Sequence, residues 1–291
     1  IHGDDVPCIV GAGLAPALLA PTPPLLPLYE GKMIHQFATY RSMPSLAQPR
    51  YWVCEQEGRN ALLGRTCDSG QKLDYQYYRL AYRSIGRKTD QRALIATILP
   101  CNVFAGNSLF ISRRLNTRDG SASSSTGDAI NLAPTPHPNS EALLIEDCEL
   151  LYLVAILNSF VADYFIGQKI SANLNMFYIY QLPVPRLTTK DVVFRMIVER
   201  AARLICTTPE YRELWETVMP GSAWSTAIVA IDACERTALR AELDGLIAHL
   251  YGLTEEEFCH VLEMFPLIEQ SVKLMALDGY LFAENDPSGG R

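Results

Sequence analysis

The segment LLYLVAILNSFVADYFI (150–166) decides the fold class of this chain. Its apolar residues recur with the period of a helix, and Asn158, Ser159 and Asp163 interrupt them. An apolar helix with polar interruptions is typical of the core of a globular protein rather than of a membrane span. We therefore predict one long core helix over residues 141–166, with Ser140 as its N-cap.

Short strand-type segments precede this helix, and only helical patterns follow it. The predicted strands cover residues 33–39, 50–55, 76–84, 92–99 and 103–112. The later helical patterns cover residues 190–206, 208–219, 232–251 and 254–265. Gly252 ends the third of these helices, and Thr254 with Glu257 forms a capping box for the fourth. The predicted fold class is α+β, a short-stranded portion with a long core helix, followed by an α-helical C-terminal tail.

Composition restricts the class of protein. The chain has 291 residues, of which 48% are hydrophobic, and its net charge of -7 gives no bulk attraction to nucleic acid or anionic lipid. Eight cysteines without a CxxC pair indicate reduced thiols, which favours a cytoplasmic location. Residues 1–27 are proline-rich and lack a basic leader, so we predict a linker from a missing upstream part and no membrane partner. Because the first residue is Ile1, we expect a fragment of a longer protein.

Positive charge is concentrated in residues 79–118, where eight basic residues face one acidic residue, Asp90. The basic residues are Arg79, Arg83, Arg87, Lys88, Arg92, Arg113, Arg114 and Arg118. Arginine favours bidentate contacts with phosphate or a guanine edge, and Tyr82 and its neighbouring tyrosines add planar surfaces. This pattern indicates a nucleic-acid face. It is also typical of a solvated strand face whose alternate tyrosines fill a core, because runs of charge are usually just solvated. Residues 113–140 are rich in Ser, Gly, Pro and Asn, so we expect a long mobile loop there.

A polar and aromatic connector follows the core helix. Asn173 and Asn175 precede Met176, Phe177 and Tyr180. The two amides could contact phosphates or adenine edges. Alternatively, they satisfy loop backbone while the aromatic rings hold the following QLPVP turn (181–185) against the long helix.

No other chemistry is supported by the spacing of residues. Glu30-Gly31-Lys32 has the ExK pattern of metal-dependent nucleases, but Pro27 and Gly31 indicate a turn instead. Cys259 and His260 lack a second close pair, so no zinc site is predicted. His35 is interpreted as a structural residue. We therefore predict no catalytic residue, no cofactor-binding residue and no metal ligand in this chain.

Four segments together resemble a known family. They are LYEGKMIHQF (28–37), YRLAYRSIGRKTDQRALIATILP (78–100), AILNSFVADYFIGQKISANLNMFYIYQLPVPR (155–186) and RAELDGLIAHLYGLTEEEFCHVLEMFPLIE (240–269). In this order they resemble the C-terminal target-recognition region of adenine-specific DNA methyltransferases in restriction-modification and phage-defence systems, of the type IIG-like kind. Gly167 departs from the pattern, because a basic residue is expected there.

The resemblance implies two domains with different functions in this chain and a catalytic domain outside it. Residues 28–187 would be the DNA target-recognition domain, and residues 188–291 a helical scaffold. The partners would be double-stranded DNA and a methyltransferase domain, either upstream or in a separate chain. That domain would flip out an adenine and methylate it with S-adenosylmethionine. This chain has no Asn-Pro-Pro-aromatic motif, since its only Pro-Pro is in Thr22-Pro23-Pro24-Leu25, and Gly11-Ala12-Gly13 leads into prolines rather than a helix. Whether the chain belongs to an enzyme is therefore undecided by its own residues.

A second hypothesis belongs to a different functional class. The chain would be a non-catalytic assembly subunit that docks on a methyltransferase or translocase partner without direct DNA contact. Leucines at helical spacing in residues 239–250 form either core or such a docking face.

Overall fold

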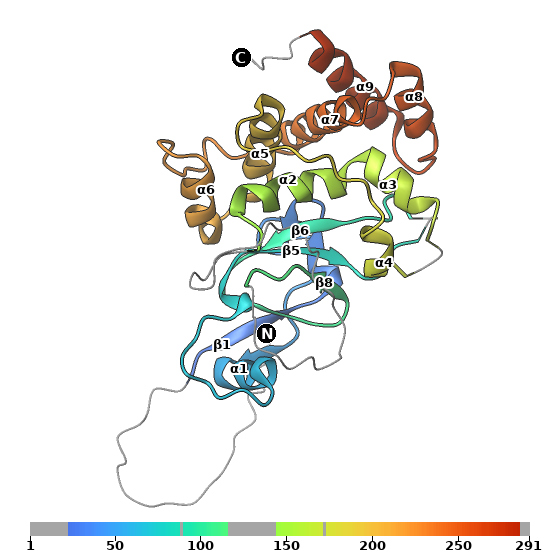
Figure 1. Cartoon of the computed structure of the whole chain (residues 1–291). Coiled ribbons are helices and arrows are strands. Elements are labelled where there is room, and N and C mark those ends of the chain that lie inside the picture. Colours follow the sequence, from blue (N-terminus) through green and yellow to red (C-terminus); the bar gives the residue numbers. More distant parts are fainter. Residues whose placement is uncertain (1–22, 88–89, 116–143, 171–172, 286–291) are drawn as a thin grey trace, which may run out of the picture.

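The computed structural model describes residues 23–87, 90–115, 144–170 and 173–285 (Figure 1). Its mixture of small sheets with a helical C-terminal region confirms the α+β prediction. In order along the vertical axis of Figure 1, an N-terminal layer, a central sheet, the core helices and the C-terminal helices lie above one another.

The central sheet has β5 (Arg79–Arg83) between β6 (Ala96–Leu99) and β8 (Leu109–Ile111), and all of its pairings are antiparallel. Its faces follow the two-residue period of a strand. Leu80, Tyr82 and Ile98 join the main core on the helix side, whereas Ala81 and Leu99 join a second cluster on the other side. Both faces of β5 are therefore covered.

The N-terminal layer covers the second face of that sheet. Its strand β1 (Leu25–Tyr29) pairs antiparallel with β4 (Trp52–Cys54) and parallel with β7 (Phe104–Ala105). The hairpin of β2 (Ile34–His35) and β3 (Ala38–Thr39) follows, and 3₁₀ turns occupy Gly31–Met33 and Asp74–Gln76. Helix α1 (Glu55–Leu63), which was not predicted, projects from this layer.

Strand β1 corrects the predicted boundary of the proline-rich linker, because residues 25–27 belong to the sheet. Pro27 is tolerated there for a geometric reason. It is in register with Trp52 of β4, whereas β7 pairs only with Leu28 and Tyr29. One side of the strand is thus unpaired at Pro27, and its missing N–H leaves no sheet hydrogen bond unmade. Residues 1–22 lie outside the described residues.

The predicted single helix over 141–166 is wrong in one respect, since two helices occupy it. Helix α2 (Asp147–Asn158) and helix α3 (Phe160–Gly167) meet at Ser159 with a bend of 60°. The N-cap of α2 is Glu146, and the predicted cap Ser140 lies outside the described residues. No single helix in the described segments is long and apolar enough to cross a bilayer. Helices α2 and α3 reach that length and apolar content only when they are counted together as a bent pair.

Polar side chains at the bend fix the two helices to the sheet. The Ser159 hydroxyl accepts from the Ala162 N–H at 3.1 Å, which caps α3. Asn158 bonds both backbone groups of Ala96 in β6, since its Nδ2 donates to the carbonyl at 2.9 Å and its Oδ1 accepts from the N–H at 3.0 Å. Asp163 accepts from the N–H groups of Ala93 and Leu94 at 3.2 and 3.0 Å. Asn158, Ser159 and Asp163, the polar residues that interrupt the apolar segment in the sequence, therefore anchor the end of α2 and the start of α3 to the sheet and cap α3.

The remaining helices follow along the chain. They are α4 (Met176–Ile179), α5 (Val192–Ile205), the 3₁₀ turn Pro209–Tyr211, α6 (Arg212–Val218), α7 (Ala233–Leu250), α8 (Glu255–Glu263) and α9 (Gln270–Asn285). Among them, α5, α6, α7 and α8 contact α2 or α3. Gly252 has a φ of +71° after α7, and the Thr254–Glu257 capping box opens α8, as predicted. No helix was predicted over residues 270–285.

Two glycines permit α9 to lie against α7. A Cβ on Gly245 would be 2.3 Å from the Gly279 backbone carbon, and a Cβ on Gly279 would be 2.3 Å from the Ala241 carbonyl oxygen. The two backbones therefore approach closely because neither glycine has a side chain.

The main hydrophobic core contains residues from both predicted domains. Tyr82, Ile98 and Leu157 come from residues 28–187, whereas Trp215 and Ile247 come from residues 188–291. The leucines of α7, Leu239, Leu243 and Leu246 among them, are buried in this core. They serve as core rather than as an exposed docking face.

Replacing Asn158 by leucine should destabilise the fold at nearly constant side-chain volume, because the buried Ala96 N–H would lose its partner and the Ala96 carbonyl would keep only the Phe37 N–H, at 3.2 Å. We expect the free energy of unfolding to fall by about 2–4 kcal/mol. Urea denaturation measures it. The control is Asn60→Ala, an exposed position in α1, for which a change within about 0.5 kcal/mol is expected. Equal stability of the two variants would contradict the role assigned to Asn158.

Candidate functional site: a connector face and an arginine-lined cleft

Two of the predicted DNA-contacting arginines are buried inside the protein. Arg79 is 5% exposed, and its guanidinium donates to the Val103 carbonyl. Burial lowers the pKa of Arg79 to about 10. Arg114 is 1% exposed and pairs with Asp147 at the start of α2. Neither guanidinium is available to a duplex in this fold, which corrects the prediction of surface contacts for both.

Tyr82, Arg83 and Arg92 are also turned inward. Tyr82 is buried, stacks on Phe110 and donates its hydroxyl to the Met176 sulfur. The Arg92 guanidinium pairs with Asp163 at 2.6 Å and donates to the Asn158 carbonyl at the same distance. Arg83 donates to the Ile34 carbonyl at 2.5 Å. Tyr82 and Arg92 are thus structural residues, whereas Arg83 lies at the edge of the cleft described below.

Only part of the predicted cationic set lies on the surface. Arg87 and Arg113 are exposed, and neither forms an ion pair with a described residue. Lys88 and Arg118 lie outside the described residues. The predicted basic segment therefore does not form one continuous surface in the part of the chain that the structure describes.

The reason lies in the neighbours of β5. Strand alternation correctly separates Tyr78 and Tyr82, which enter the main core, from Arg79 and Arg83 on the opposite face. The arginine face is not solvated, however, because β2 and the residues before β7 lie against it and their carbonyls accept from the guanidinium groups. Sequence periodicity assigns faces, but it does not tell whether a second layer covers one of them.

The structure does bring the predicted asparagines next to the basic segment. Asn173 forms an antiparallel bridge with Ile85, and the Leu174 N–H donates to the Ser84 carbonyl at 2.9 Å. Asn173 and Asn175 are both exposed. Chain segments about ninety residues apart in sequence therefore form one surface strip.

We define the connector face as Ile85, Arg87, Asn173, Asn175 and Phe177. The Phe177 side chain is 67% exposed and the Ile85 side chain 59% exposed, which makes them two of the most exposed large apolar residues of the described chain. Apolar and planar groups beside amides and a guanidinium are the combination that binds bases and phosphates. Lys169 lies close in sequence, is exposed, and bonds Gln181 at 2.7 Å.

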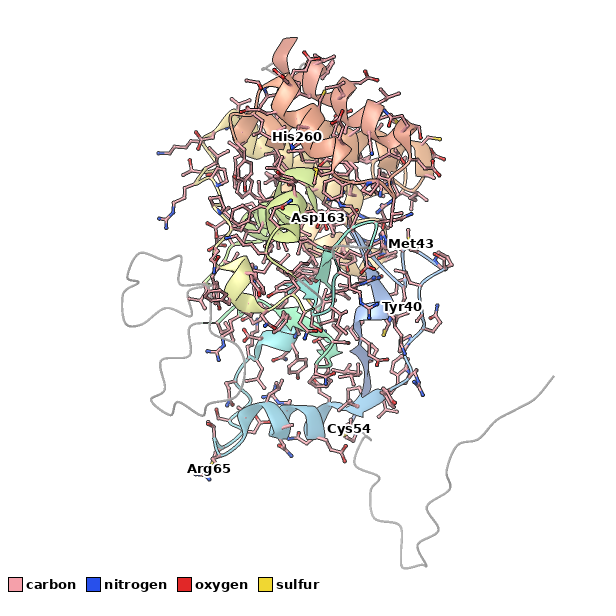
Figure 2. All side chains as sticks on the ribbon, turned by 90° about the vertical axis from the view of Figure 1, so that its right-hand side faces the viewer. Tyr40, Met43, Cys54, Arg65, Asp163 and His260 are labelled. Carbon is pink, nitrogen blue, oxygen red and sulfur yellow. The ribbon has the colours of Figure 1, made fainter. Side chains whose placement is uncertain are left out.

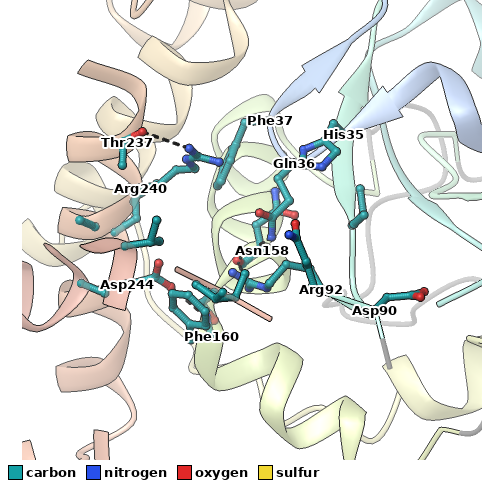
Figure 3. A pocket seen from close by; sticks show the side chains of 18 of the residues that line it. His35, Gln36, Phe37, Asp90, Arg92, Asn158, Phe160, Thr237, Arg240 and Asp244 are labelled. Atoms are coloured by element: carbon teal, nitrogen blue, oxygen red, sulfur yellow. Dashed lines mark hydrogen bonds between the residues drawn. The ribbon is translucent and has the colours of Figure 1, made fainter. Parts of the chain in front are cut away.

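A cleft of about 730 Å³ separates α7 and α9 from the sheet side of the molecule (Figure 3). Its walls come from the β2–β3 hairpin, the segment before β6, the α2–α3 break, α7, and the α8–α9 connection with α9. In Figure 3, Arg240 and Asp244 on α7 lie opposite Phe37, Asn158 and Phe160. Figure 2 places Asp163, the partner of Arg92, in the middle of the molecule between the sheet and the C-terminal helices.

Three guanidinium groups, those of Arg83, Arg92 and Arg240, line this cleft together with the carboxylates of Asp90, Asp244 and Glu269. Burial and then the charges of Arg83, Arg240, Arg92 and Arg236 lower the pKa of His35 to about 4, so His35 is neutral at neutral pH. Burial raises the pKa of Asp244 to about 6, against the lowering effect of Arg92, of the Phe160 N–H and of Arg240. His35 was predicted only as a structural residue, and its position in the wall of a cleft was not predicted. No sequence signal connected Arg240 to Arg83, because their proximity depends on how α7 packs.

The described residues offer no metal site, since no group of three or more His, Cys, Asp or Glu side chains among them could hold an ion. The seven cysteines of the described segments are free thiols. Gly11 and Gly13, the glycines weighed as a cofactor loop, lie outside the described residues.

Comparison with known proteins adds no relative. The chain matches no protein-family model, and neither a curated protein nor a solved structure was found to be similar to it.

The two titratable groups of the cleft should give opposite pH dependences of stability. Asp244 has a raised pKa in the folded state, so its contribution is complete below about pH 4 and is lost as pH rises through about 6. His35 has a lowered pKa, so its contribution is complete above about pH 6.5 and is lost as pH falls towards about 4. A pKa change of about two units corresponds to about 3 kcal/mol in the free energy of unfolding, lost with rising pH for Asp244 and with falling pH for His35.

Urea denaturation of Asp244→Asn and His35→Gln between about pH 4.5 and 7 checks this assignment. Relative to the wild type, Asp244→Asn should gain stability as pH rises, and His35→Gln should gain stability as pH falls. Parallel curves for the two variants would show that these groups do not titrate as described.

Proposed function

We propose that this chain is the sequence-specific DNA recognition module of an adenine-N6 DNA methyltransferase of a restriction-modification or phage-defence system. Methyl transfer from S-adenosylmethionine would be carried out by a domain outside this chain. The proposal is supported by the four ordered segments that resemble this family and by the connector face, which joins residues from two of them.

The connector face carries the proposal. Arg87, Asn173, Asn175 and Phe177 are each exposed, on two segments that the Ile85–Asn173 bridge joins, and no described carboxylate forms an ion pair with Arg87. Arg87 would neutralise a phosphate, which positions the duplex. The amides can bond adenine edges in the bidentate manner that Asn adopts, and Phe177 supplies a flat apolar surface for a base or sugar. Arg113 would add a second phosphate contact.

A second candidate is favoured by a specific observation. The guanidinium groups of Arg79, Arg92 and Arg114 bond to partners inside the protein. Fewer basic side chains of residues 79–118 are therefore available to DNA than the composition of that segment indicated. The chain would then be an assembly subunit that docks on a methyltransferase or translocase without touching DNA.

The decisive experiment measures duplex binding by fluorescence anisotropy over a salt series. For Arg87→Ala we expect weaker binding to all duplexes. The slope of log K against log salt concentration should also become smaller by about one, because the variant neutralises one phosphate fewer and releases about one counterion fewer. For Asn173→Ala or Asn175→Ala we expect a loss of about 1–3 kcal/mol confined to one base-pair position of the target.

The matched control is Arg195→Ala, which removes an exposed arginine from α5, away from the connector face. Its affinity and salt slope should equal those of the wild type. Identical slopes for Arg87→Ala and the wild type would count against the proposed face. Co-purification with a methyltransferase partner without duplex binding would favour the assembly subunit.

A further inference from the structure

We propose that the cleft between α7 and the α2–α3 break binds a phosphate-bearing ligand of nucleotide size. This inference goes beyond the proposed DNA-recognition function and does not depend on it. The cleft and the connector face share only Ile85, and the residues that would hold the phosphate, Arg83 and Arg240, lie outside the connector face.

Two guanidinium groups of the cleft, those of Arg83 and Arg240, have no carboxylate within ion-pair distance among the described residues. Arg92 also lines it but is neutralised by Asp163 at 2.6 Å. Neither Arg83 nor Arg240 forms an ion pair with a described residue. A positive charge withdrawn from water is costly unless a counter-charge meets it, and a bound anion would supply one.

Donors of these arginines remain available to such an anion. Arg83 uses one terminal nitrogen on the Ile34 carbonyl, and its Nε is buried without any partner among the described residues. Arg240 makes only long bonds within its own helix, at 3.4 Å to the Arg236 carbonyl and 3.3 Å to the Thr237 hydroxyl (Figure 3). Burial lowers the pKa of each guanidinium, which reflects the loss of solvation.

Three carboxylates also line the cleft, but none of them forms an ion pair with Arg83 or Arg240. Burial raises the pKa of Asp244 to about 6, so it is ionised at neutral pH, but its carboxylate accepts from the Phe160 N–H at 2.9 Å rather than from an arginine. Asp90 and Glu269 also line the cleft, but both are exposed and therefore screened by water. The arginine fork matches the geometry of phosphate oxygens, which favours phosphate over a single-point anion.

The size and shape of the cleft select the class of ligand. A volume of about 730 Å³ is within the range of small-molecule sites. Helices on one side and the sheet side on the other leave no room for a duplex. Phe37 and Phe160 line the same space, although both are largely covered by neighbours, and they give the walls an apolar part suited to a base or sugar.

Isothermal titration calorimetry of the full chain tests the proposal with deoxyadenosine 5′-monophosphate, inorganic phosphate and deoxyadenosine as probes. We expect saturable binding of the nucleotide, weaker binding of phosphate and none of the nucleoside. Arg240→Gln should weaken nucleotide binding by at least about ten-fold, which is one charge-assisted contact. Arg195→Gln is the control and should bind as the wild type does.

Arg83→Gln should show the same loss. If that variant fails to fold, as judged by circular dichroism, Arg240→Gln alone decides, because its bonds stay within one helix. Absence of saturable nucleotide binding at millimolar concentration, or unchanged binding in folded Arg240→Gln, would overturn the proposal. Equal binding of nucleotide and nucleoside would overturn it too.

Duplex binding separates this inference from the proposed function. Arg240→Gln should retain duplex affinity and lose the nucleotide, whereas Arg87→Ala should retain the nucleotide and lose duplex affinity. Failure of one proposal therefore leaves the other measurable.

Discussion

The architecture depends on the hydrogen bonds that Asn158 and Asp163 make to the main chain of β6 and the residues before it. These two side chains satisfy four backbone groups of residues 93–96 that the sheet does not pair on that side. Buried backbone groups without partners are costly, so this arrangement fixes where the core helices lie on the sheet. The two anchoring residues lie on either side of Ser159, where the chain bends by 60° between α2 and α3.

The bend at Ser159 also gives rise to the cleft. Asn158, Ser159 and Phe160 line one wall of it, and α7 is held opposite by the bond from the Phe160 N–H to Asp244. Arg92 ties the segment before β6 to the same bend, since it pairs with Asp163 and lies 4.3 Å from the centre of the Phe160 ring. A buried ion pair of this kind is weak evidence for stability, but it specifies position, because each partner left alone would be an uncompensated charge.

The distribution of charge has a different meaning in three dimensions from the one it has along the chain. Several basic residues between 79 and 118 serve the interior, where they bond carbonyls and carboxylates of other layers. Of the exposed remainder, Arg87 belongs to the connector face with Asn173, Asn175 and Phe177. A basic segment can thus hold a sheet in place and still contribute surface residues for a polyanion, and the two roles fall to different arginines.

The sequence by itself determined the α+β class, the C-terminal helices after residue 190, the capping box of α8 and the assignment of tyrosines and arginines to opposite faces of β5. These features rest on periodicity and caps, which are local. Three others required the tertiary structure: the division of the core helix at Ser159, the burial of Arg79 and Arg114, and the pairing of α9 with α7 through Gly245 and Gly279. Each depends on which layer lies against a given face, and that is decided by contacts between residues tens to more than a hundred positions apart. The candidate sites divide in the same way. The asparagines of the connector were visible in the sequence, whereas the meeting of Arg83 with Arg240 across a cleft followed only from the packing of α7 against the sheet side.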